Sequence, residues 1–576
     1  MTTEEREAGM ETALSYHEET KHHLHRYARS LGYLAWEDQP NPFREFQAGP
    51  TRTDQRVELP LAQQEEPLPF VELFSGQPAA AQDLSLRTLG RFFELSLALS
   101  AWKEIPGHRW ALRINPSSGN LHPTEAYALL PAVEQLGSGG GAYHYLSRDH
   151  TLELRSRWNC SKTMNPSPRS FVAGNGGRGV AGPAAGFYVA FTSVPWRESW
   201  KYGERAFRYC QHDLGHALAA VRFSAATLGW KAQIQTVAPE YLVWLLGLQP
   251  PAHPLEPEIP ESLVWIQTAA AESPFALPPV DALLERFGQP NQLSAGHQPW
   301  PLIDQVVSAT KDTDFTNYHE SAAVEERSGQ GMALPAGAIR SPPTPPWPEL
   351  RPVSCLQPAE RIIRQRRSAL GFDGATALSR AAFLQILDQT LARPQVPPFD
   401  VWEIPVRVHL VLFVHRVTGL APGLYLWLRD ERQLEALRAA FGPGFVWKRD
   451  EECPLFELKR GDLRDFSKTV CCHQAVASDG AFSLGMLAHF EPVLRARGPH
   501  TYRELFWETG VIGQSLYLGA EAAGMRGTGI GCFFDDVLHE ALGLKDHAWQ
   551  SLYHFTVGAP VDDPRLRSAP PYERKR

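Results

Sequence analysis

The chain has 576 residues, 43% of them hydrophobic and 21% charged, a composition typical of a folded globular protein. It excludes a disordered, collagen-like or coiled-coil chain. Lysine and arginine number 56 against 64 aspartate and glutamate residues, which gives a net charge of −8. Because there is no basic surplus to neutralise a phosphate backbone, we expect no nucleic-acid partner.

The N-terminal segment is acidic and polar, unlike a secretory signal. The longest apolar run, Tyr241 to Leu246, is six residues long, whereas a membrane-spanning helix needs about 18. Seven scattered cysteines without a C-x-x-C pair favour free thiols in a reducing compartment. We therefore expect a soluble, cytoplasmic protein without membrane contact. One basic cluster fits either a solvated surface or a docking site for an acidic peptide: Lys21, His22, His23, His25, Arg26 and Arg29.

Two parts of the chain repeat each other. Residues 141–155 align without gaps on 423–437 at an offset of 282, and the strand-like segments before them match at the same offset. Farther along, 215–229 matches 510–524 at an offset of 295. Because the matches occur in the same order, they predict a duplicated domain.

Each half is expected to hold several strands, a long helix and a closing strand, an order that indicates an α+β domain rather than a series of βαβ units. The two long helices carry small residues on one face, as buried central helices do. Eight prolines within 335–358 predict an extended linker between the halves. The expected organisation is an N-terminal extension (1–65), a first domain (66–270), a linker (271–355) and a second domain (356–576).

Two further motifs imitate functional sites. GNGGRG at 174–179 fits G-x-G-x-x-G, but a Pro/Ser-rich stretch precedes it and a strand-like run follows, so we interpret it as a loop. His212 and His216 have the spacing of a zinc-binding pair, yet Val511 takes the place of His216 in the second copy. We interpret them as hydrogen-bonded helix histidines and expect no metal.

Two other motifs combine groups that bind ligands, although each alone also fits an ordinary turn or helix start. PSSGN at 116–120 offers two hydroxyls, a carboxamide and a tight turn. RRS at 366–368 offers two guanidiniums, which suit a phosphate, and two arginines after the last strand are expected to close on the same anion. The candidate residues are Pro116, Ser117, Ser118 and Asn120 in the first half, and Arg366, Arg367, Ser368, Arg565 and Arg567 in the second.

Taken together and in this order, the motifs resemble the nitroreductase-like FMN flavoprotein superfamily, and most closely the SagB-type dehydrogenases, the branch of the thiazoline and oxazoline oxidases. Residues 16–46 and 200–209 also resemble long SagB-type sequences. In that superfamily FMN lies between two copies of the fold, and motifs like RRS and PSSGN reach one FMN from opposite subunits. The resemblance implies an α+β fold of two tandem nitroreductase-like domains that form an intramolecular pseudo-dimer around FMN.

The repeat sharpens this expectation. At the offset of 282, Ser117–Asn120 fall on Phe399–Trp402, so the second half lacks the flavin-contact motif. No arginine or lysine lies between Arg56 and Arg87, so the first half lacks the phosphate clamp. One complete set of motifs remains, and we predict one FMN site and one dead site, because a phosphate buried without its guanidiniums is costly. Leu370 stands where the family often has another arginine.

The resemblance also assigns groups to the reaction. Gly531 and Cys532 resemble the turn whose backbone N–H faces flavin N5. Lys201 and Tyr202 match the pair proposed as catalytic in the azoline-oxidising relatives, where a general base removes a proton while hydride leaves to the flavin. A salt-bridged helix start, with Glu204 and Arg205 close by, is the competing interpretation of that pair.

The expected function is therefore an FMN-dependent oxidoreductase that dehydrogenates a heterocycle or a similar C–N substrate, either a small molecule or a peptide. One alternative is a nitro- or quinone-type reductase that takes hydride from NAD(P)H. Another is a non-catalytic flavin-binding or scaffold subunit of a peptide-modifying complex, in which the N-terminal extension docks a partner. The sequence does not define the substrate, the electron partner or the oligomeric state.

Overall fold

The computed structural model describes residues 3–47, 56–62, 68–76, 79–131, 140–158, 186–268, 274–280, 282, 284–311, 355–402 and 405–572. The GNGGRG loop at 174–179 and most of the predicted proline-rich linker lie outside these residues. Below, the first half means the described residues from 56 to 311, and the second half those from 355 to 572.

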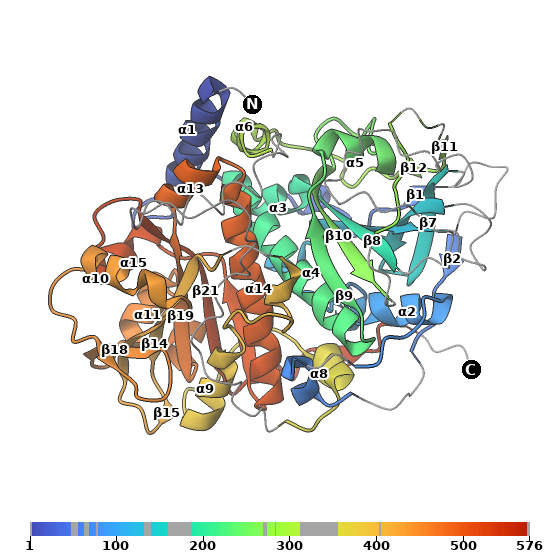
Figure 1. Cartoon of the computed structure of the whole chain (residues 1–576). Helices are drawn as coiled ribbons and strands as arrows, with labels where there is room; N and C mark the ends of the chain where they lie inside the picture. Colours follow the sequence, from blue (N-terminus) through green and yellow to red (C-terminus); the bar gives the residue numbers. More distant parts are fainter. Residues whose placement is uncertain are drawn as a thin grey trace, which may run out of the picture.

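Each half is built on a mixed sheet-and-helix unit whose main sheet is antiparallel (Figure 1). The first sheet has the order β11-β7-β6-β5-β8-β10-β9, with β2 on β7. Its strands are β2 (Arg56–Glu58), β5 (Thr124–Leu130), β6 (Gly140–Leu146), β7 (Thr151–Trp158), β8 (Gly186–Ser193), β9 (Lys231–Gln235), β10 (Ile259–Gln267) and β11 (Glu285–Arg286).

The second sheet has the order β17-β18-β16-β14-β19-β21-β20. Six of its strands repeat the first sheet, because β18-β16-β14-β19-β21-β20 corresponds in order to β7-β6-β5-β8-β10-β9. The two halves therefore share their strand order, as the repeated sequence segments predict. The strands are β14 (Val408–Val414), β16 (Gly423–Trp427), β17 (Lys448–Arg449), β18 (Leu455–Arg460), β19 (Phe482–His489), β20 (Arg526–Ile530) and β21 (Trp549–Gly558).

The two long helices, α4 (Ala206–Thr227) and α14 (Thr501–Ala522), pack against each other in the centre of the molecule (Figure 1). Their backbones meet at Gly215 and Gly510. A β-carbon added to Gly215 would lie 2.8 Å from the Gly510 Cα and would also overlap the carbonyl oxygen of Trp507. Two of the small residues that the sequence places on the helix faces, Gly215 and Gly510, are thus where the two backbones touch.

A second contact between the halves is reciprocal, as expected of a pseudo-twofold arrangement. Pro69 and Pro358 form an antiparallel bridge, just before η2 (Phe70–Phe74) and α8 (Ala359–Gln365). Phe70 N donates to Gln357 O at 2.8 Å, and Ala359 N donates to Leu68 O at 2.8 Å. The two halves therefore contact each other through corresponding short segments.

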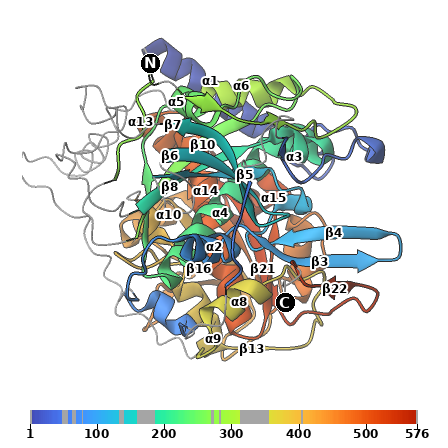
Figure 2. The same cartoon turned by 90° about the vertical axis from the view of Figure 1, so that its right-hand side faces the viewer.

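The N-terminal extension ties the two halves together. Helix α1 (Thr3–Glu19) lies beside α6 (Pro301–Ala309) (Figures 1 and 2). The carboxylate of Asp535, which is fully buried in the second half, accepts hydrogen bonds from Arg205 at 2.9 Å, from Arg208 at 2.8 Å and from the backbone N–H of His22 at 2.9 Å. One carboxylate thus joins the extension to both halves.

This arrangement corrects the interpretation of the N-terminal basic cluster. Lys21 is only 3% exposed and pairs with Asp536 at 3.0 Å, and His22 is also buried. Neither side chain is available to an acidic partner, because both face the second half of the same chain. Only His25, Arg26 and Arg29 of that cluster are exposed.

Part of the segment predicted as a linker is folded. Between residues 284 and 311 lie β11, β12 (Gln289–Pro290) and α6, and β12 pairs with β1 (Phe46–Gln47) of the extension. The proline-dense stretch begins only at residue 335, so the composition that predicts an extended chain does not apply to these residues.

The C-terminal end returns to the first half. Strand β22 (Arg567–Ala569) pairs with β3 (Leu99–Ile105), which forms a hairpin with β4 (His108–Arg113) (Figure 2). The hydroxyl of Tyr572 donates to Ser147 O at 2.6 Å and accepts the N–H of Leu99 at 2.9 Å. The second half therefore adds a strand to a hairpin of the first half.

Local sequence signals explain several of the remaining boundaries. Helix α2 begins at a capping box formed by Ser85 and Thr88. Helix α3 begins with a proline, and α5 and α15 end at Gly247 and Gly543 in the left-handed conformation. No helix in the described part of the chain is long and apolar enough to cross a membrane.

The remaining elements are η1 (Trp36–Asp38), α2 (Leu86–Glu94), η3 (Ser118–Asn120), α3 (Pro195–Tyr202), η6 (Gly203–Arg205), α5 (Pro239–Leu246), β13 (Leu378–Ser379), α9 (Arg380–Asp388), η7 (Phe399–Val401), β15 (Val417–Thr418), η8 (Glu431–Gln433), α10 (Leu434–Ala440), α11 (Arg464–Val470), α12 (Val476–Asp479), α13 (Glu491–Arg497) and α15 (Asp535–Leu542).

Replacing Gly215 with alanine forces α4 and α14 apart, because the new β-carbon overlaps the α14 backbone. We expect the free energy of unfolding, measured by urea denaturation, to fall by about 1–3 kcal/mol. Gly371→Ala is the matched control, since a β-carbon there has nothing within 4 Å, and it should change stability by less than about 0.5 kcal/mol. Equal effects of the two variants would contradict the close helix contact.

Asp535→Ala leaves two guanidiniums buried without their carboxylate. We expect a loss of about 3–5 kcal/mol in the same measurement. Glu435→Ala, which removes an exposed ion pair with Arg438, should cost less than about 0.5 kcal/mol. A loss below about 1 kcal/mol for Asp535→Ala would show that this carboxylate does not hold the extension to the two halves.

Candidate active site

The loop at 116–120 has a strained backbone. Gly119, Asn120 and His122 adopt positive φ values of 56°, 60° and 56°. Only glycine takes this conformation at little cost, and for other residues it persists only where the surroundings enforce it, often at functional sites. The PSSGN motif is therefore held in a defined shape.

Hydrogen bonds hold that shape. The N–H and the hydroxyl of Ser118 both donate to the carboxylate of Asp213 on α4, at 3.0 and 2.9 Å. The hydroxyl of Ser117 accepts the N–H of His122 at 2.8 Å. The side-chain amide of Asn120 donates to the carbonyl of Ala111 at 2.8 Å. Three residues of the motif are thus fixed by their own side chains.

The Lys-Tyr pair lies against this loop. A β-carbon at Gly119 would stand 2.5 Å from the Tyr202 hydroxyl and 3.2 Å from Lys201 Nζ. Helix α3 therefore brings both candidate catalytic side chains to the turn of the PSSGN motif. The absent side chain of Gly119 is what leaves them room.

The RRS motif of the second half lies on the chain that leads into this loop. Arg366 is 3% exposed, and its guanidinium donates to the carbonyls of Ile114 and Arg113 at 3.2 and 3.0 Å. Its Nη1 is buried and has no hydrogen-bond partner among the described residues. The hydroxyl of Ser368 forms a hydrogen bond of 2.8 Å with the hydroxyl of Tyr517 on α14. Arg366 of the second half thus contacts the first half at the residues just before the PSSGN motif.

Further cations gather beside this motif. Burial, and after it the neighbouring Arg366 and Arg526, lower the pKa of Arg367 to about 10. Burial, followed by Arg367, also lowers the pKa of Lys103 on β3. The carboxyl of Glu521 lies near them, and burial raises its pKa. Cations that lower one another's pKa values form a site suited to an anion.

The two C-terminal arginines are placed differently from their prediction. The side chain of Arg565 is 84% exposed and pairs with Asp563 at 2.6 Å, and Arg567 is exposed in β22. Neither side chain belongs to the group of cations around buried Arg366. Lys103 and Arg526 are the cations found there instead, and Lys103 donates to the hydroxyl of Ser568 at 2.7 Å. The sequence does not reveal Lys103, because it lies near Arg367 only through the contact of Arg367 with Ser100 on the same strand, β3.

The turn at 531–532 completes the region. A β-carbon at Gly531 would overlap the ring of Tyr209 on α4. The Tyr209 ring in turn lies 4.4 Å, centroid to centroid, from that of Tyr202. The carbonyl of Gly531 accepts a hydrogen bond from Arg205 at 3.2 Å. Gly531 of the second half is therefore two aromatic rings away from the PSSGN loop of the first.

Two buried carboxyls adjoin the Lys-Tyr pair, and sequence reasoning missed both. Burial raises the pKa of Asp213 to about 7, although hydrogen bonds from Ser117 and Ser118 oppose the shift. Glu198 is fully buried, and neither of its carboxyl oxygens has a hydrogen-bond partner among the described residues. Burial raises its pKa well above the usual range, and Asp213 raises it further. The spacing of Glu198 one helical turn before Lys201 and Tyr202 is the signal that could have identified it.

The paired histidines of α4 have protein partners. His212 Nδ1 lies 2.9 Å from the hydroxyl of Thr509, and His216 Nε2 lies 3.2 Å from that of Tyr553. Both partners belong to the second half. The two imidazoles are thus hydrogen-bonded helix residues at the contact between the halves.

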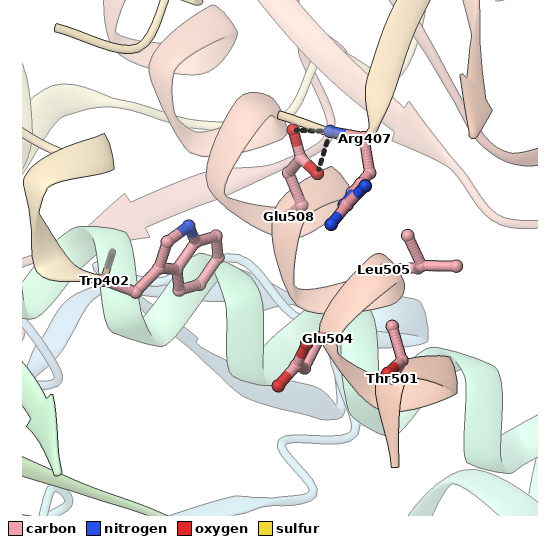
Figure 3. A pocket seen from close by; sticks show the side chains of 6 residues that line it. All are labelled: Trp402, Arg407, Thr501, Glu504, Leu505 and Glu508. Carbon is pink, nitrogen blue, oxygen red and sulfur yellow. Dashed lines mark hydrogen bonds between the residues drawn. The ribbon is translucent and has the colours of Figure 1, made fainter. Parts of the chain in front are cut away.

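The second half holds the counterpart of this site, around a small cavity (Figure 3). The offset of 282 places Trp402 at the position of Asn120, and the offset of 295 places Glu508 at that of Asp213. The cavity measures about 10 Å³ and holds no more than one water molecule. Its lining residues are Trp402, Arg407, Thr501, Glu504, Leu505 and Glu508.

Side chains of the protein fill the position in the second half that corresponds to the PSSGN site. Glu508 accepts the N–H of Arg407 at 3.1 Å and forms a buried ion pair with Arg429 (Figure 3 shows the bond to Arg407). The Arg429 guanidinium stands over the ring of Phe399 at 4.8 Å, and Phe399 begins η7 where the first half has η3. The second half thus keeps the strands and helices around this position, while Phe399–Trp402 stand in place of Ser117–Asn120.

Comparisons with known proteins agree with this architecture. Residues 363–559, within the second half, match the profile of the nitroreductase family. The crystal structure of a putative nitroreductase from Anabaena variabilis is similar over nearly the whole length: 21% identity, 96% of this chain and 99% of that chain covered, and a TM-score of 0.63. The complete chain therefore has the fold of that protein.

Other solved structures are similar over less than half of the chain. A putative nitroreductase from Ralstonia eutropha is 15% identical, with 41% of this chain and 95% of that chain covered and a TM-score of 0.27. A chain of the Escherichia coli microcin synthetase McbBCD complex is 18% identical, with 46% and 94% covered and a TM-score of 0.27. No curated protein matched the sequence.

Proposed function

We propose that the protein is an FMN-dependent oxidoreductase of the SagB type, with a single cofactor site shared by the two halves. The observation that carries this proposal is the position of Arg366, whose guanidinium lies on the backbone that leads into the PSSGN loop. Neither half has both motifs, so the fold of the complete chain is needed to build one site.

The groups present fit FMN. The buried, unpartnered Nη1 of Arg366 and the adjoining cations match a phosphate dianion. The hydroxyls and the carboxamide of residues 116–120 suit the ribityl chain and the flavin edge, and the backbone at 531–532 is the candidate contact to N5. When bound, FMN supplies the hydride acceptor. The residues proposed to hold it are Pro116, Ser117, Ser118, Asn120, Arg366, Arg367, Ser368, Gly531 and Cys532, together with Lys103 and Arg526.

We assign the transfer of the substrate proton to side chains of the first half. Burial holds the pKa of Tyr202 well above its usual range, so its hydroxyl stays protonated. Lys201, beside it, is the candidate base for the C–H next to the substrate nitrogen, by its resemblance to the Lys-Tyr pair of the azoline-oxidising relatives. Glu198 lies near that amine, and Asp213, whose pKa is raised to about 7, is the carboxyl beside them that can take up the proton. This chemistry suits dehydrogenation of a heterocycle in a small molecule or a peptide.

A nitro- or quinone-type reductase is the second candidate, favoured by the match of residues 363–559 to the nitroreductase family. Addition of NADPH without air distinguishes the two. Rapid bleaching of the flavin by NADPH alone supports the reductase. Bleaching only by an azoline-containing substrate supports the dehydrogenase. A preparation that takes up no flavin would leave a scaffold role.

The cofactor prediction concerns Arg366 and Asn120. The purified protein should be yellow, and Arg366→Ala should weaken FMN binding by about 2–5 kcal/mol, since it removes a buried charge from the phosphate. Asn120→Ala should also reduce flavin content, as read from the visible spectrum at matched protein concentration. Arg565→Ala is the control, because its exposed side chain should leave FMN binding unchanged. Full flavin retention in both Arg366→Ala and Asn120→Ala, confirmed as folded by circular dichroism, would defeat the shared site.

The raised pKa of Asp213 gives a pH prediction for the flavin-free protein. Between about pH 4 and pH 7 the folded state keeps a proton that the unfolded state has released. Its contribution to stability is complete below about pH 4 and is lost as the pH rises through 7. Asp213→Asn does not titrate, so the wild type should lose up to about 4 kcal/mol relative to this variant across that range.

Urea unfolding at several pH values measures the difference. Asp562→Asn, at an exposed carboxyl, is the control and should follow the wild type. Parallel stability curves for the wild type and Asp213→Asn would show that Asp213 titrates normally.

A further inference from the structure

The N-terminal extension carries an aromatic surface segment, residues 24–36. Among the described residues, the exposed phenylalanine, tyrosine and tryptophan side chains all lie in it: Tyr27, Tyr33 and Trp36 are 52%, 67% and 65% exposed. Leu24, in the same segment, is 50% exposed. Single apolar side chains are ordinary on a protein surface, but a group of large ones in one short segment is typical of an interaction site.

The aromatic segment is fastened to the helix that carries the Lys-Tyr pair. The carbonyl of Arg29 accepts the N–H of Glu204 at 3.0 Å. The carbonyl of Ala35 accepts the indole N–H of Trp200 at 2.9 Å. The two backbones touch at Gly203, where an added β-carbon would overlap Arg29 O. Because the protein already holds this segment in place, a ligand that binds to it pays little to order it.

The same segment also reaches the turn at 531–532. The ring of Tyr27 lies 5.8 Å, centroid to centroid, from that of Phe534, two residues after this turn. Farther along the segment, the ring of Trp36 lies 5.6 Å from that of Trp200 on α3. The aromatic segment thus contacts both the turn after β20 and the helix α3, which belong to the candidate active site.

The charge of this surface indicates which ligand it fits. Residues 21–36 contain no aspartate or glutamate, in a chain whose net charge is −8. Arg26 is exposed, and Arg29 keeps 72% of its side chain exposed although it pairs with Glu204 at 3.3 Å. Exposed aromatic rings beside guanidiniums suit a ligand that has both apolar side chains and carboxylates. An acidic peptide has both.

We propose that the aromatic segment binds an acidic, extended part of the peptide that carries the substrate heterocycle. That the bound peptide is the substrate rests on the proposed function. The apolar side chains of the peptide pack on the three exposed aromatic rings, and its carboxylates pair with Arg26 and Arg29. Because the segment is fastened to α3, the attached heterocycle is held close to Lys201, which raises its local concentration there.

Binding of a defined probe to the flavin-free, full-length protein tests the docking surface without any redox reaction. The probe is a short fluorescein-labelled peptide of alternating glutamate and leucine, and the matched control peptide has lysine in place of every glutamate. In fluorescence anisotropy we expect the acidic peptide to bind at least about tenfold more tightly than the basic one. Added salt should weaken this binding, because the guanidiniums are exposed.

Variants locate the binding site. Trp36→Ala should weaken binding of the acidic peptide by about tenfold or more, since aromatic anchors carry much of the binding energy at interfaces. Trp36→Tyr should restore most of the affinity. Val446→Ala is the matched control, because it removes an apolar side chain that is 64% exposed in the second half, and it should bind like the wild type. Circular dichroism checks that each variant is folded.

The proposal is overturned if the acidic and basic peptides bind with equal affinity, or if Trp36→Ala binds the acidic peptide as tightly as Val446→Ala. Self-association of the wild type that Trp36→Ala abolishes would also overturn it, because the segment would then serve a second copy of the chain.

The redox reaction separates this failure from a failure of the proposed function. Trp36→Ala should raise the KM for an azoline within an acidic peptide and leave kcat unchanged, and flavin bleaching by a free azoline should stay at the wild-type rate. If the flavin is bleached with the same KM in the wild type and in Trp36→Ala, the function stands and the docking surface is wrong.

Discussion

The close contact of α4 and α14 at Gly215 and Gly510 sets the relation between the two halves. Because no side chain separates the helix backbones there, the two sheets come near enough for side chains on each helix to work in a common region. Helix α4 carries Asp213, which fixes the PSSGN loop, and α14 carries Tyr517, which holds Ser368 of the RRS motif. Without this contact the PSSGN and RRS motifs would lie on the surfaces of two separate domains.

The duplication gives two equivalent positions, one in each half, but the residues at these positions differ. Counting eight residues from the paired prolines reaches Arg366 in the second half, but Gln77 in the first. On the opposite side, the ion pair of Glu508 with Arg429 occupies the position that corresponds to the PSSGN site. In this buried pair the Glu508 carboxylate neutralises the Arg429 guanidinium, which would otherwise be available to bind an anion. One position thus gathers the candidate ligand-binding groups, and protein side chains fill the other.

Sequence patterns identified the features that depend on residues close together in the sequence. The repeat predicted the shared strand order. In the structure Lys201 and Tyr202 lie beside Gly119, and Arg366 contacts the backbone at Arg113 and Ile114, just before the PSSGN loop. What the sequence did not reveal depends on contacts between distant segments. Lys103 joins the cations through the contact of Arg367 with strand β3 at Ser100. Asp535 meets Arg205 and Arg208 because the two halves pack against each other. The prediction for Arg565 failed for the same reason, since closeness to the last strand did not determine the direction of its side chain.

The central claim is that two copies of one fold build one FMN site. Calorimetric titration of the flavin-free, full-length protein with FMN tests it most directly, because the stoichiometry counts the sites without reference to any substrate. We predict one FMN bound per chain, with no further heat of binding after the first equivalent. Two equivalents per chain would contradict the account, because the position around Trp402 and Glu508 would then also hold the cofactor.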